Sequence, residues 1–293
     1  MTAGEGGLGK QSLAPGLYVV ATPIGNLEDV TLRALRVLRQ ADLIACEDTR
    51  HTQKLLNHYQ IATQTISYHE HNEAARASEL IARLKNGARI ALVTDAGMPG
   101  ISDPGFRVIS LAIANGVLVV PIPGATALVA ALAGSGLPTD KFRFVGFLPA
   151  KQGERRKVLE TIRSAKETQI FYEAPHRVAE TIEDIVNVLG AARTVVVARE
   201  VSKVHEEFLR GTAIEVIQAL QSSGEIKGEI TLLIGKAADA GPDDLKGQAA
   251  ISERLNEIMT ADKLDEKAAL KKVARERGIS KSEAYREWQK SKP

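Results

Sequence analysis

Short apolar runs alternate with segments of helical periodicity along the first part of the chain. Between residues 27 and 40, apolar side chains recur at the three- and four-residue spacing of a helix face, and a glycine at position 87 ends a later helical pattern. Such alternation predicts a three-layer α/β structure with a mostly parallel sheet. The predicted strands are residues 17–22, 43–46, 65–68, 89–93 and 117–120, and the predicted helices are 27–40, 53–58, 77–84 and 106–115.

A second α/β half follows the segment Pro121-Ile122-Pro123-Gly124, which we interpret as a joint. We therefore predict two α/β domains, residues 16–121 and 122–236, with a cleft between them. A linker rich in Ala, Gly and Asp follows at residues 237–247. The predicted strands of this half are 143–147, 169–172, 194–198, 206–210 and 229–234, and its predicted helices are 125–133, 178–189 and 213–221.

The two ends of the chain differ from its middle. Residues 248–293 predict a small helical domain, in which two helices across a glycine turn are typical of a helix-turn-helix. Residues 262–293 hold ten Lys/Arg and six Asp/Glu, a charge of +4, whereas the other 261 residues hold 28 and 30, a charge of −2. This asymmetry favours a polyanionic partner, although a solvated helical surface explains the charge from composition equally well. Residues 1–15 are glycine-rich without an apolar core, so we expect a disordered tail rather than a secretory signal.

Composition excludes several classes of protein. No apolar run approaches the roughly 20 residues that span a bilayer, so we expect no membrane association. Cys46 is the single cysteine, which rules out an internal disulfide and fits a reducing compartment, the cytoplasm. Only 4% of residues are aromatic, which disfavours an aromatic platform for stacking bases.

The stretch from Thr94 to Gly105 stands out among the predicted loops. It contains three glycines, two prolines, two aspartates and a serine, and it follows a strand, where open α/β sheets bind ligands. It also exceeds the four to six residues of an ordinary connection, so we favour a binding loop over a simple turn. Similar loops lie at 23–26, 123–126 and 171–177, and none is a dinucleotide fingerprint or a P-loop. Together the four loops predict a cleft that holds one elongated ligand.

These loops carry a resemblance to a known family. The chain resembles the bacterial 16S ribosomal RNA cytidine 2′-O-ribose methyltransferases of the tetrapyrrole methylase superfamily. The resemblance runs from about residue 16 to 235, and the C-terminal helices are similar to that family's appended helix-turn-helix. The matching segments are residues 21–27, 47–50, 67–72, 94–105, 123–127, 172–177 and 228–231.

The resemblance implies S-adenosylmethionine as methyl donor, bound folded in the cleft largely by main-chain groups. It also implies 16S rRNA or the small ribosomal subunit as partner and a homodimer as assembly. One departure is visible, because relatives have Gly-Asp-Pro where this chain has Gly97-Met98-Pro99, and Asp95 is a candidate to replace the lost carboxylate. By position, the implied cofactor-binding residues are Ile24, Asp95, Gly97, Ile101, Thr126, Ala127, Phe171, Tyr172, Gly228 and Glu229.

The implied reaction needs alignment and a base, because a ribose hydroxyl is a weak nucleophile. Candidate bases are Glu47, Asp48 and His69, although Glu47 and Asp48 beside Arg50 are also typical of a structural ion-pair cluster. Arg50 and Arg177 suit phosphate contacts. The histidines near position 70 provide too few converging ligands for a metal site, so we expect no metal.

Three hypotheses follow. The first is a methyltransferase acting on a ribose of 16S rRNA. The second is a C-methyltransferase for tetrapyrroles, against which the basic C-terminal helices argue. The third is a non-catalytic ribosome-assembly factor that retains the pocket.

Overall fold

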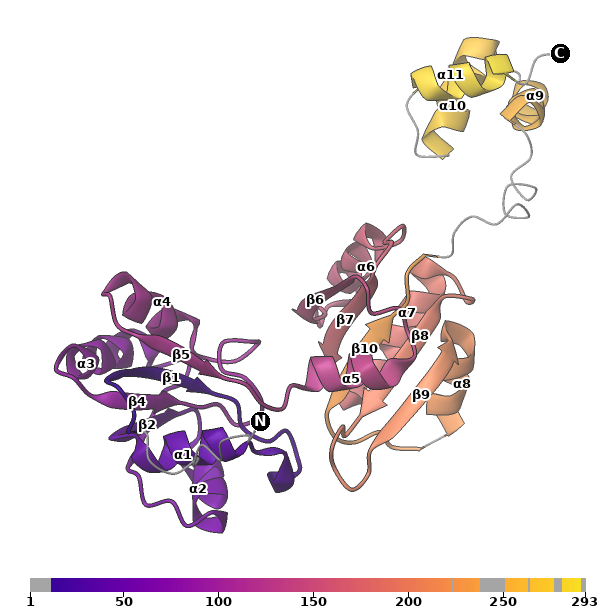
Figure 1. Ribbon diagram of the computed structural model, residues 1–293. Coiled ribbons are helices and arrows are strands. Elements are labelled where there is room, and N and C mark those ends of the chain that lie inside the picture. The colour runs from indigo at the N-terminus through magenta and orange to yellow at the C-terminus, as the bar shows by residue number, and fades with distance from the viewer. Residues whose placement is uncertain (1–11, 223, 238–250, 263, 277–280, 291–293) are drawn as a thin grey trace, which may run out of the picture. The chain divides into compact units, whose positions relative to one another are not determined.

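The computed structural model describes residues 12–222, 224–237, 251–262, 264–276 and 281–290 (Figure 1). It contains two compact units, residues 1–237 and 238–293. Most of the predicted N-terminal tail, the predicted linker and the predicted glycine turn at 278 lie outside the described residues. Of the tail, residues 12–15 are described, and the Tyr18 hydroxyl donates to the Ala14 carbonyl at 2.7 Å.

The first sheet confirms the predicted parallel α/β half. Its five strands run in the order β3-β2-β4-β1-β5, and every pair is parallel. Successive side chains of a strand face opposite sides, so Leu17 and Val19 pack toward α3 and α4, whereas Tyr18 and Val20 pack toward α1 and α2. The elements are β1 (Gly16–Val20), α1 (Leu32–Gln40), β2 (Leu43–Cys46), α2 (Thr49–His58), β3 (Thr65–Ser67), α3 (Glu73–Lys85), β4 (Arg89–Leu92), α4 (Phe106–Ala114) and β5 (Val119–Ile122).

Two helices of this half begin elsewhere than predicted, because a cap decides where each starts. The predicted helix 27–40 is divided into a 3-10 turn, η1 (Leu27–Asp29), and α1, since Thr31 Oγ1 accepts from the Ala34 amide at 3.0 Å and caps α1. Helix α2 begins four residues before the predicted start, because the Asp48 carboxylate accepts from the Arg50 amide at 2.8 Å.

The second sheet is mixed and has the order β6-β7-β10-β8-β9. Only β6 and β7 are parallel, and the other pairs are antiparallel. Helix α5 covers one face, and α6, α7 and α8 cover the other (Figure 1). The elements are α5 (Ala127–Ser135), β6 (Phe142–Phe147), α6 (Gln152–Thr161), β7 (Thr168–Glu173), η2 (Pro175–Arg177), α7 (Val178–Leu189), β8 (Thr194–Arg199), β9 (Glu207–Thr212), α8 (Ala213–Ser222) and β10 (Ile230–Ile234).

Helix α6 was absent from the sequence prediction. Of its residues, only Arg155 and Leu159 are buried, so it lacks an apolar stripe. Ion pairs therefore add to the packing of Leu159 against α7, because Asp184 of α7 is fully buried and pairs with Arg155 at 2.7 Å and with Arg156 at 2.6 Å.

The C-terminal unit is helical, as predicted. Its helices α9 (Ile251–Asp262), α10 (Glu266–Glu276) and α11 (Lys281–Lys290) share one core that includes Leu270 and Trp288. Among the described residues, no helix has the length and apolar character needed to cross a membrane.

Candidate functional site

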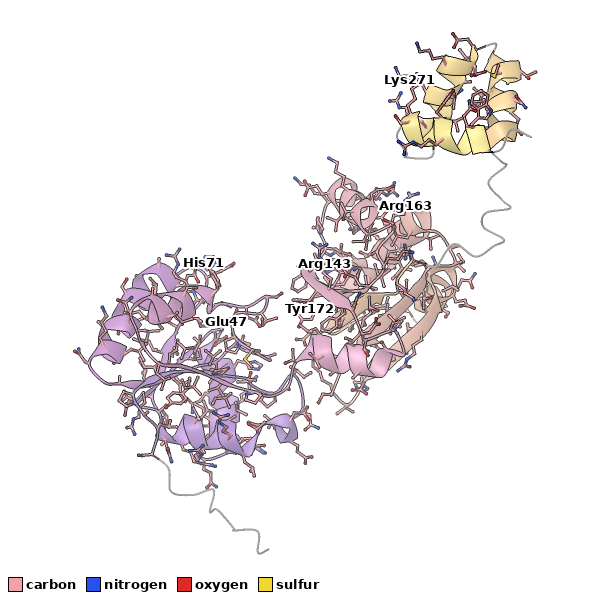
Figure 2. All side chains as sticks on the ribbon, turned by 45° about the horizontal axis from the view of Figure 1, so that its top comes forward. Glu47, His71, Arg143, Arg163, Tyr172 and Lys271 are labelled. Atoms are coloured by element: carbon pink, nitrogen blue, oxygen red, sulfur yellow. The ribbon has the colours of Figure 1, made fainter. Side chains whose placement is uncertain are left out.

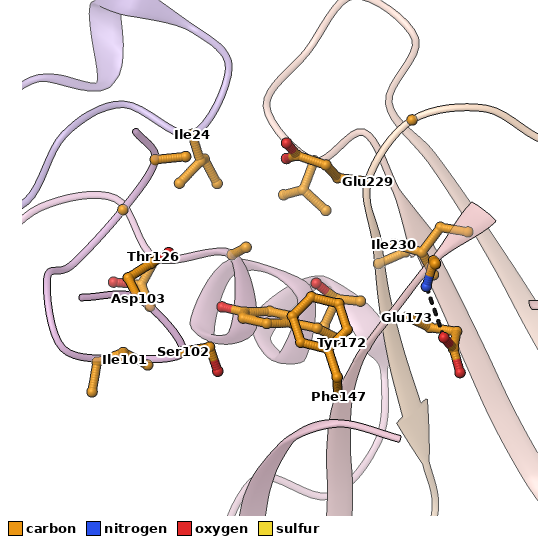
Figure 3. Close-up of a pocket in the computed structure, with 18 of the residues that line it drawn as sticks. Ile24, Ile101, Ser102, Asp103, Thr126, Phe147, Tyr172, Glu173, Glu229 and Ile230 are labelled. Carbon is orange, nitrogen blue, oxygen red and sulfur yellow. Dashed lines mark hydrogen bonds between the residues drawn. The ribbon is translucent and has the colours of Figure 1, made fainter. Parts of the chain in front are cut away.

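A cavity of about 370 Å³ lies where loops from both sheets converge (Figure 3). Eight of the ten predicted cofactor-binding residues line it. They are Ile24, Gly97, Ile101, Thr126, Ala127, Tyr172, Gly228 and Glu229. Ile24 and Glu229 lie on opposite sides in the close-up, with the Tyr172 ring between the two sheets.

The other two predicted residues lie near the cavity without lining it. Phe171 is fully buried in the core beneath α7, because neighbouring strand residues face opposite sides and Tyr172 takes the cavity side. Asp95 lies beside the lining residue Ala96, and its Oδ1 accepts from the Asp48 amide at 3.1 Å.

The loop after β4 forms the first wall with unusual backbone geometry. Gly97 has φ +86° and forms an antiparallel bridge with Thr22, just beyond β1. Gly105 has φ +144°, and a Cβ there would lie 3.1 Å from the Gly100 amide nitrogen. These glycines therefore allow a turn that residues with a side chain resist, and they bring main-chain groups to the cavity.

Aromatic side chains form part of the opposite wall. The Tyr172 ring meets those of Phe144 and Phe147 edge to face, at centroid distances of 5.0 and 5.6 Å. Phe147 remains 58% exposed and lines the cavity, so this wall offers an apolar surface to a planar ligand.

The segment before β10 completes that wall. Gly228 has φ +93°, and a Cβ there would lie 2.4 Å from the Glu200 side chain. The Glu200 carboxylate accepts from the Glu229 amide at 2.9 Å and pairs with Lys203 at 2.7 Å. Gly228 thus lets Glu200 hold the backbone of Glu229 at the cavity.

Two contacts join the β8–β9 connection to the loop after β1. The Ser202 hydroxyl donates to the Asp29 carboxylate. Lys203 packs against Gly25 so closely that a Cβ would lie 2.2 Å from its side chain. The two halves of the first unit are therefore in direct contact beside the cavity.

Carboxylates surround the first-sheet side of the cavity. Burial, together with the negative charges of Glu47, Asp95 and Glu229, raises the pKa of Asp103 to about 7. Burial also raises the pKa of Glu47, with a contribution from Asp95. Such a set of carboxylates favours a ligand that carries positive charge.

A second cavity, of about 750 Å³, adjoins the first. Ser102 and Asp103 line both cavities. The other lining residues are Glu47, Glu70, Glu73, Pro104, Gly105, Phe106, Arg107, Ser110 and Leu111.

The three candidate bases have different surroundings. Glu47 lines the second cavity, and Figure 2 shows it on the first-sheet side of the unit. Asp48 pairs with Arg50 at 2.9 Å, which lowers the pKa of its carboxyl to about 2. His69 Nε2 lies 3.2 Å from Asn72 Nδ2, and neither Asp48 nor His69 lines either cavity.

The two arginines predicted to bind phosphate also differ. The Arg50 side chain is 89% exposed, although it pairs with Asp48 at 2.9 Å. Arg177 donates to the buried Glu173 carboxylate and, at 2.9 Å, to the Leu148 carbonyl, so it already has partners within the protein. The described residues contain no group of three or more His, Cys, Asp or Glu side chains arranged to hold a metal ion.

Sequence reasoning did not single out several residues of the cavities. Asp103 and Ser102 lie in the predicted binding loop, whose glycines and prolines marked it as a binding segment. The sequence analysis chose Asp95 of that loop as the candidate carboxylate and did not name Asp103. Phe147 is the last residue of β6, and its ring is exposed. Nothing in the sequence around it indicates that exposure.

Comparison with known proteins assigns the chain to a family. The model of the Tetrapyrrole (Corrin/Porphyrin) Methylases matches residues 16–217. A protein of Halalkalibacterium halodurans named ribosomal RNA small subunit methyltransferase I is 48% identical, over 92% of this chain and 93% of its own. The protein of the same name from Bacillus subtilis is 43% identical, over 92% of each chain.

Solved structures agree at the level of the fold. A diphthine synthase has a TM-score of 0.59 at 16% identity, over 75% of this chain and 89% of its own. The uroporphyrin-III C-methyltransferase of Thermus thermophilus, solved with S-adenyl homocysteine, has a TM-score of 0.52 at 18% identity, over 75% and 97%. The family model and the two sequence relatives show that the chain belongs to the tetrapyrrole methylase family and, within it, to the ribosomal RNA small subunit methyltransferases I.

Proposed function

We propose that this protein transfers the methyl group of S-adenosylmethionine to the ribose 2′-hydroxyl of a cytidine in 16S rRNA. Relatives that share 43–48% identity over nearly the whole chain are named as small-subunit rRNA methyltransferases. The observation that carries the proposal is the cavity between the two sheets, with apolar walls and carboxylates on one side.

The cavity suits the proposed donor chemically. Phe147, Tyr172 and Ile230 offer apolar surface to an adenine ring. Asp103 and Glu229 line the same space, and their negative charge favours a sulfonium cation. The donor, when bound, supplies an electrophilic methyl group on a positively charged sulfur, so the protein has to align the acceptor and accept one proton.

The candidate bases of the sequence differ in how well they suit proton transfer. A carboxylate serves best when its pKa lies near the working pH. The ion pair with Arg50 gives Asp48 a pKa far below that range, whereas burial moves the pKa of Glu47 toward it. Of these three residues, Glu47 also lines the cavity next to the donor site.

The partner that we propose is 16S rRNA, free or within the small subunit, and we propose a cytoplasmic homodimer as the working form. Arg50 is exposed and suits a phosphate contact. Sedimentation equilibrium of the full chain tests the assembly, for which a single species of one-chain mass would exclude the dimer.

The reaction is tested with tritium-labelled S-adenosylmethionine and small subunits from cells that lack the protein. We expect label in a single ribose of 16S rRNA. Label in a base would refute the ribose assignment, and transfer to a uroporphyrinogen-type substrate alone would favour a tetrapyrrole methylase. Donor binding without transfer to any RNA would favour an assembly factor.

A further inference from the structure

The segment that runs from β6 through α6 carries a dense positive charge. Residues 141–166 hold eight Lys/Arg and two Asp/Glu, a charge of +6, whereas the other 267 residues of the chain hold 30 and 34, a charge of −4. The sequence analysis singled out the charge of the C-terminal helices and not this one. Charge of one sign that is concentrated on one strand and one helix is typical of a surface that binds a polyanion.

Some of this charge holds α6 in place. Arg155 is buried, and both it and Arg156 pair with the buried Asp184 of α7, at 2.7 and 2.6 Å. Arg163 pairs with Glu160 at 2.9 Å. These cations already have anionic partners within the protein, so we do not assign them to a ligand.

The other cations at the start of the segment and on the outer side of α6 are less committed. Among the described residues, the side chains of Lys141, Arg143 and Lys157 make no hydrogen bond or ion pair, and all three are exposed. Lys151 is 82% exposed and reaches only Glu154 at 3.7 Å, a contact between two exposed groups that contributes little. Exposed cations of this kind can neutralise phosphates and release the counterions of a nucleic acid.

Arg143 lies on the face of the edge strand β6 that α6 covers. In the parallel register it is the neighbour of Gln169, and Phe171, two residues further along β7, belongs to the same core as Leu159 of α6. In-register neighbours and alternate residues of a strand face the same side, so Arg143 and α6 share one face of the sheet. Figure 2 shows Arg143 and Arg163 on this half of the unit. The residues that we call the β6–α6 surface are Lys141, Arg143, Lys151 and Lys157.

The β6–α6 surface adjoins the cavity proposed for the donor. Phe147, the last residue of β6, lines that cavity, and Lys151 follows it by four residues. A strand rises about 3.3 Å per residue, so Arg143 lies roughly 13 Å from Phe147. Three glutamates line the second cavity, and their charge repels phosphate there. An RNA chain whose ribose reaches the donor therefore finds cations for its neighbouring phosphates along β6 and α6.

We propose that the β6–α6 surface binds the phosphate backbone of rRNA beside the acceptor nucleotide. This inference rests on the proposed function, which supplies an RNA substrate. Each contact joins a cationic side chain to a phosphate oxygen, so the surface positions the RNA and adds affinity, whereas contacts to base edges have to select the nucleotide. Because its four residues line neither cavity, the surface acts on substrate binding and not on the transfer step.

The test removes three cations of the surface from the full chain. The surface variant combines Lys141→Gln, Arg143→Gln and Lys157→Gln. Binding to small subunits from cells that lack the protein is measured against salt concentration. The surface variant should lose about 2 from the salt slope and bind roughly 100-fold more weakly at 0.1 M salt, because each phosphate contact to a single strand contributes about 0.7 to the slope.

A matched control removes the same charge and the same residue types elsewhere. It combines Arg33→Gln, Lys54→Gln and Lys85→Gln, which are exposed on α1, α2 and α3 and line neither cavity. Its salt slope should equal that of the wild type. Exchange of lysine for arginine and of arginine for lysine at the three surface positions should restore the slope that the glutamines remove, because a phosphate contact needs the charge.

Two further measurements separate RNA binding from other roles. Calorimetry with S-adenosylhomocysteine and urea unfolding should give the surface variant the wild-type values, because its three positions are exposed and outside both cavities. In methyl transfer, the subunit concentration that gives half the maximal rate should rise with the loss of affinity. The maximal rate should change by less than about threefold, as expected when a contact is equal in the ground and transition states.

Equal salt slopes in the wild type and the surface variant would overturn the proposal and leave the proposed function intact. Equal losses in the surface variant and the control would also overturn it, because net charge alone would then explain the binding. A maximal rate that falls as much as the affinity would assign these cations to the transfer step instead. A reduced slope in the surface variant, with no transfer by the wild type, would support the RNA surface and refute the proposed function.

Discussion

Gly97 and Thr22 exchange a pair of backbone hydrogen bonds, with N–O distances of 3.2 and 2.9 Å. The Thr22 hydroxyl also donates to the Thr94 carbonyl at 3.1 Å. These bonds tie the loop after β4 to the end of β1. The first wall of the proposed donor cavity is therefore held by two main-chain hydrogen bonds and by the Thr22 hydroxyl.

Replacing Gly97 with alanine should weaken donor binding. Its φ of +86° is strained for alanine, and the new Cβ would lie 3.5 Å from the Ile24 side chain. Gly87→Ala is a matched control, since φ there is +87° and a Cβ meets open space. Both variants should lose roughly 1 kcal/mol of unfolding free energy. Only G97A should bind S-adenosylhomocysteine more weakly in calorimetry, and equal affinities would show that the wall tolerates the change.

The two arginines assigned to RNA should respond differently to alanine. Arg50→Ala should change urea unfolding little, because its ion pair with Asp48 is exposed. It should reduce the salt dependence of RNA binding by about one ion, because the guanidinium is 89% exposed and can reach a phosphate. Arg177→Ala should cost roughly 3 kcal/mol of stability, because it leaves the buried Glu173 carboxylate without its cation. A smaller salt slope in R177A at wild-type stability would instead assign Arg177 to RNA.

Helix α6 should depend on its buried ion pairs. Asp184→Ala removes the nearer carboxylate partner of Arg155, which is 1% exposed, and leaves only Glu180 at 3.7 Å, so it should destabilise the protein by about 3 kcal/mol. Glu160→Ala removes a pair with Arg163 in which both side chains are more than half exposed, and should change stability by less than about 0.5 kcal/mol. Urea denaturation measures both, and similar losses would mean that burial is not decisive here.

The C-terminal unit should add affinity for RNA. Deleting residues 238–293 removes the whole unit, whereas a deletion from 262 would leave the apolar face of α9 without its core. Lys267, Lys271 and Lys281 are exposed, and Lys271 is labelled in Figure 2. Changing all three to glutamine should reduce the salt slope of RNA binding by up to about 2, and arginine at the same positions should restore it. An unchanged salt slope in the glutamine variant would show that these three lysines make no contact with RNA phosphates.

Local pattern was enough to predict many elements of the fold. Residues 43–46 and 178–189 form a strand and a helix with the predicted bounds, because apolar periodicity and neighbouring turn residues agree there. Helix α6 escaped prediction because a buried arginine replaces its apolar stripe. Pattern also leaves strand direction open, so the antiparallel pairs of the second sheet became visible only in the structure.

The cavity was predicted as a set of loops, but its members were not all distinguishable. Phe171 and Tyr172 are adjacent, and the choice of the cavity-facing ring depends on which side of β7 α5 covers. Asp103 acquires its raised pKa from burial and from the carboxylates of Asp95 in its own loop and of Glu47 and Glu229 on two other segments. This pKa depends on which side chains the fold brings near Asp103, and the residues next to Asp103 in the sequence do not reveal them.

The contacts of Ser202 with Asp29 and of Lys203 with Gly25 have a thermodynamic consequence. A ligand that contacts both sheets binds the folded arrangement in which these contacts are present, so its binding free energy adds to the stability of the first unit. By linkage, S-adenosylhomocysteine at a hundred times its dissociation constant should stabilise that unit by about 2.7 kcal/mol. Both sheets should then unfold at a higher temperature and in a single transition in a calorimetric scan.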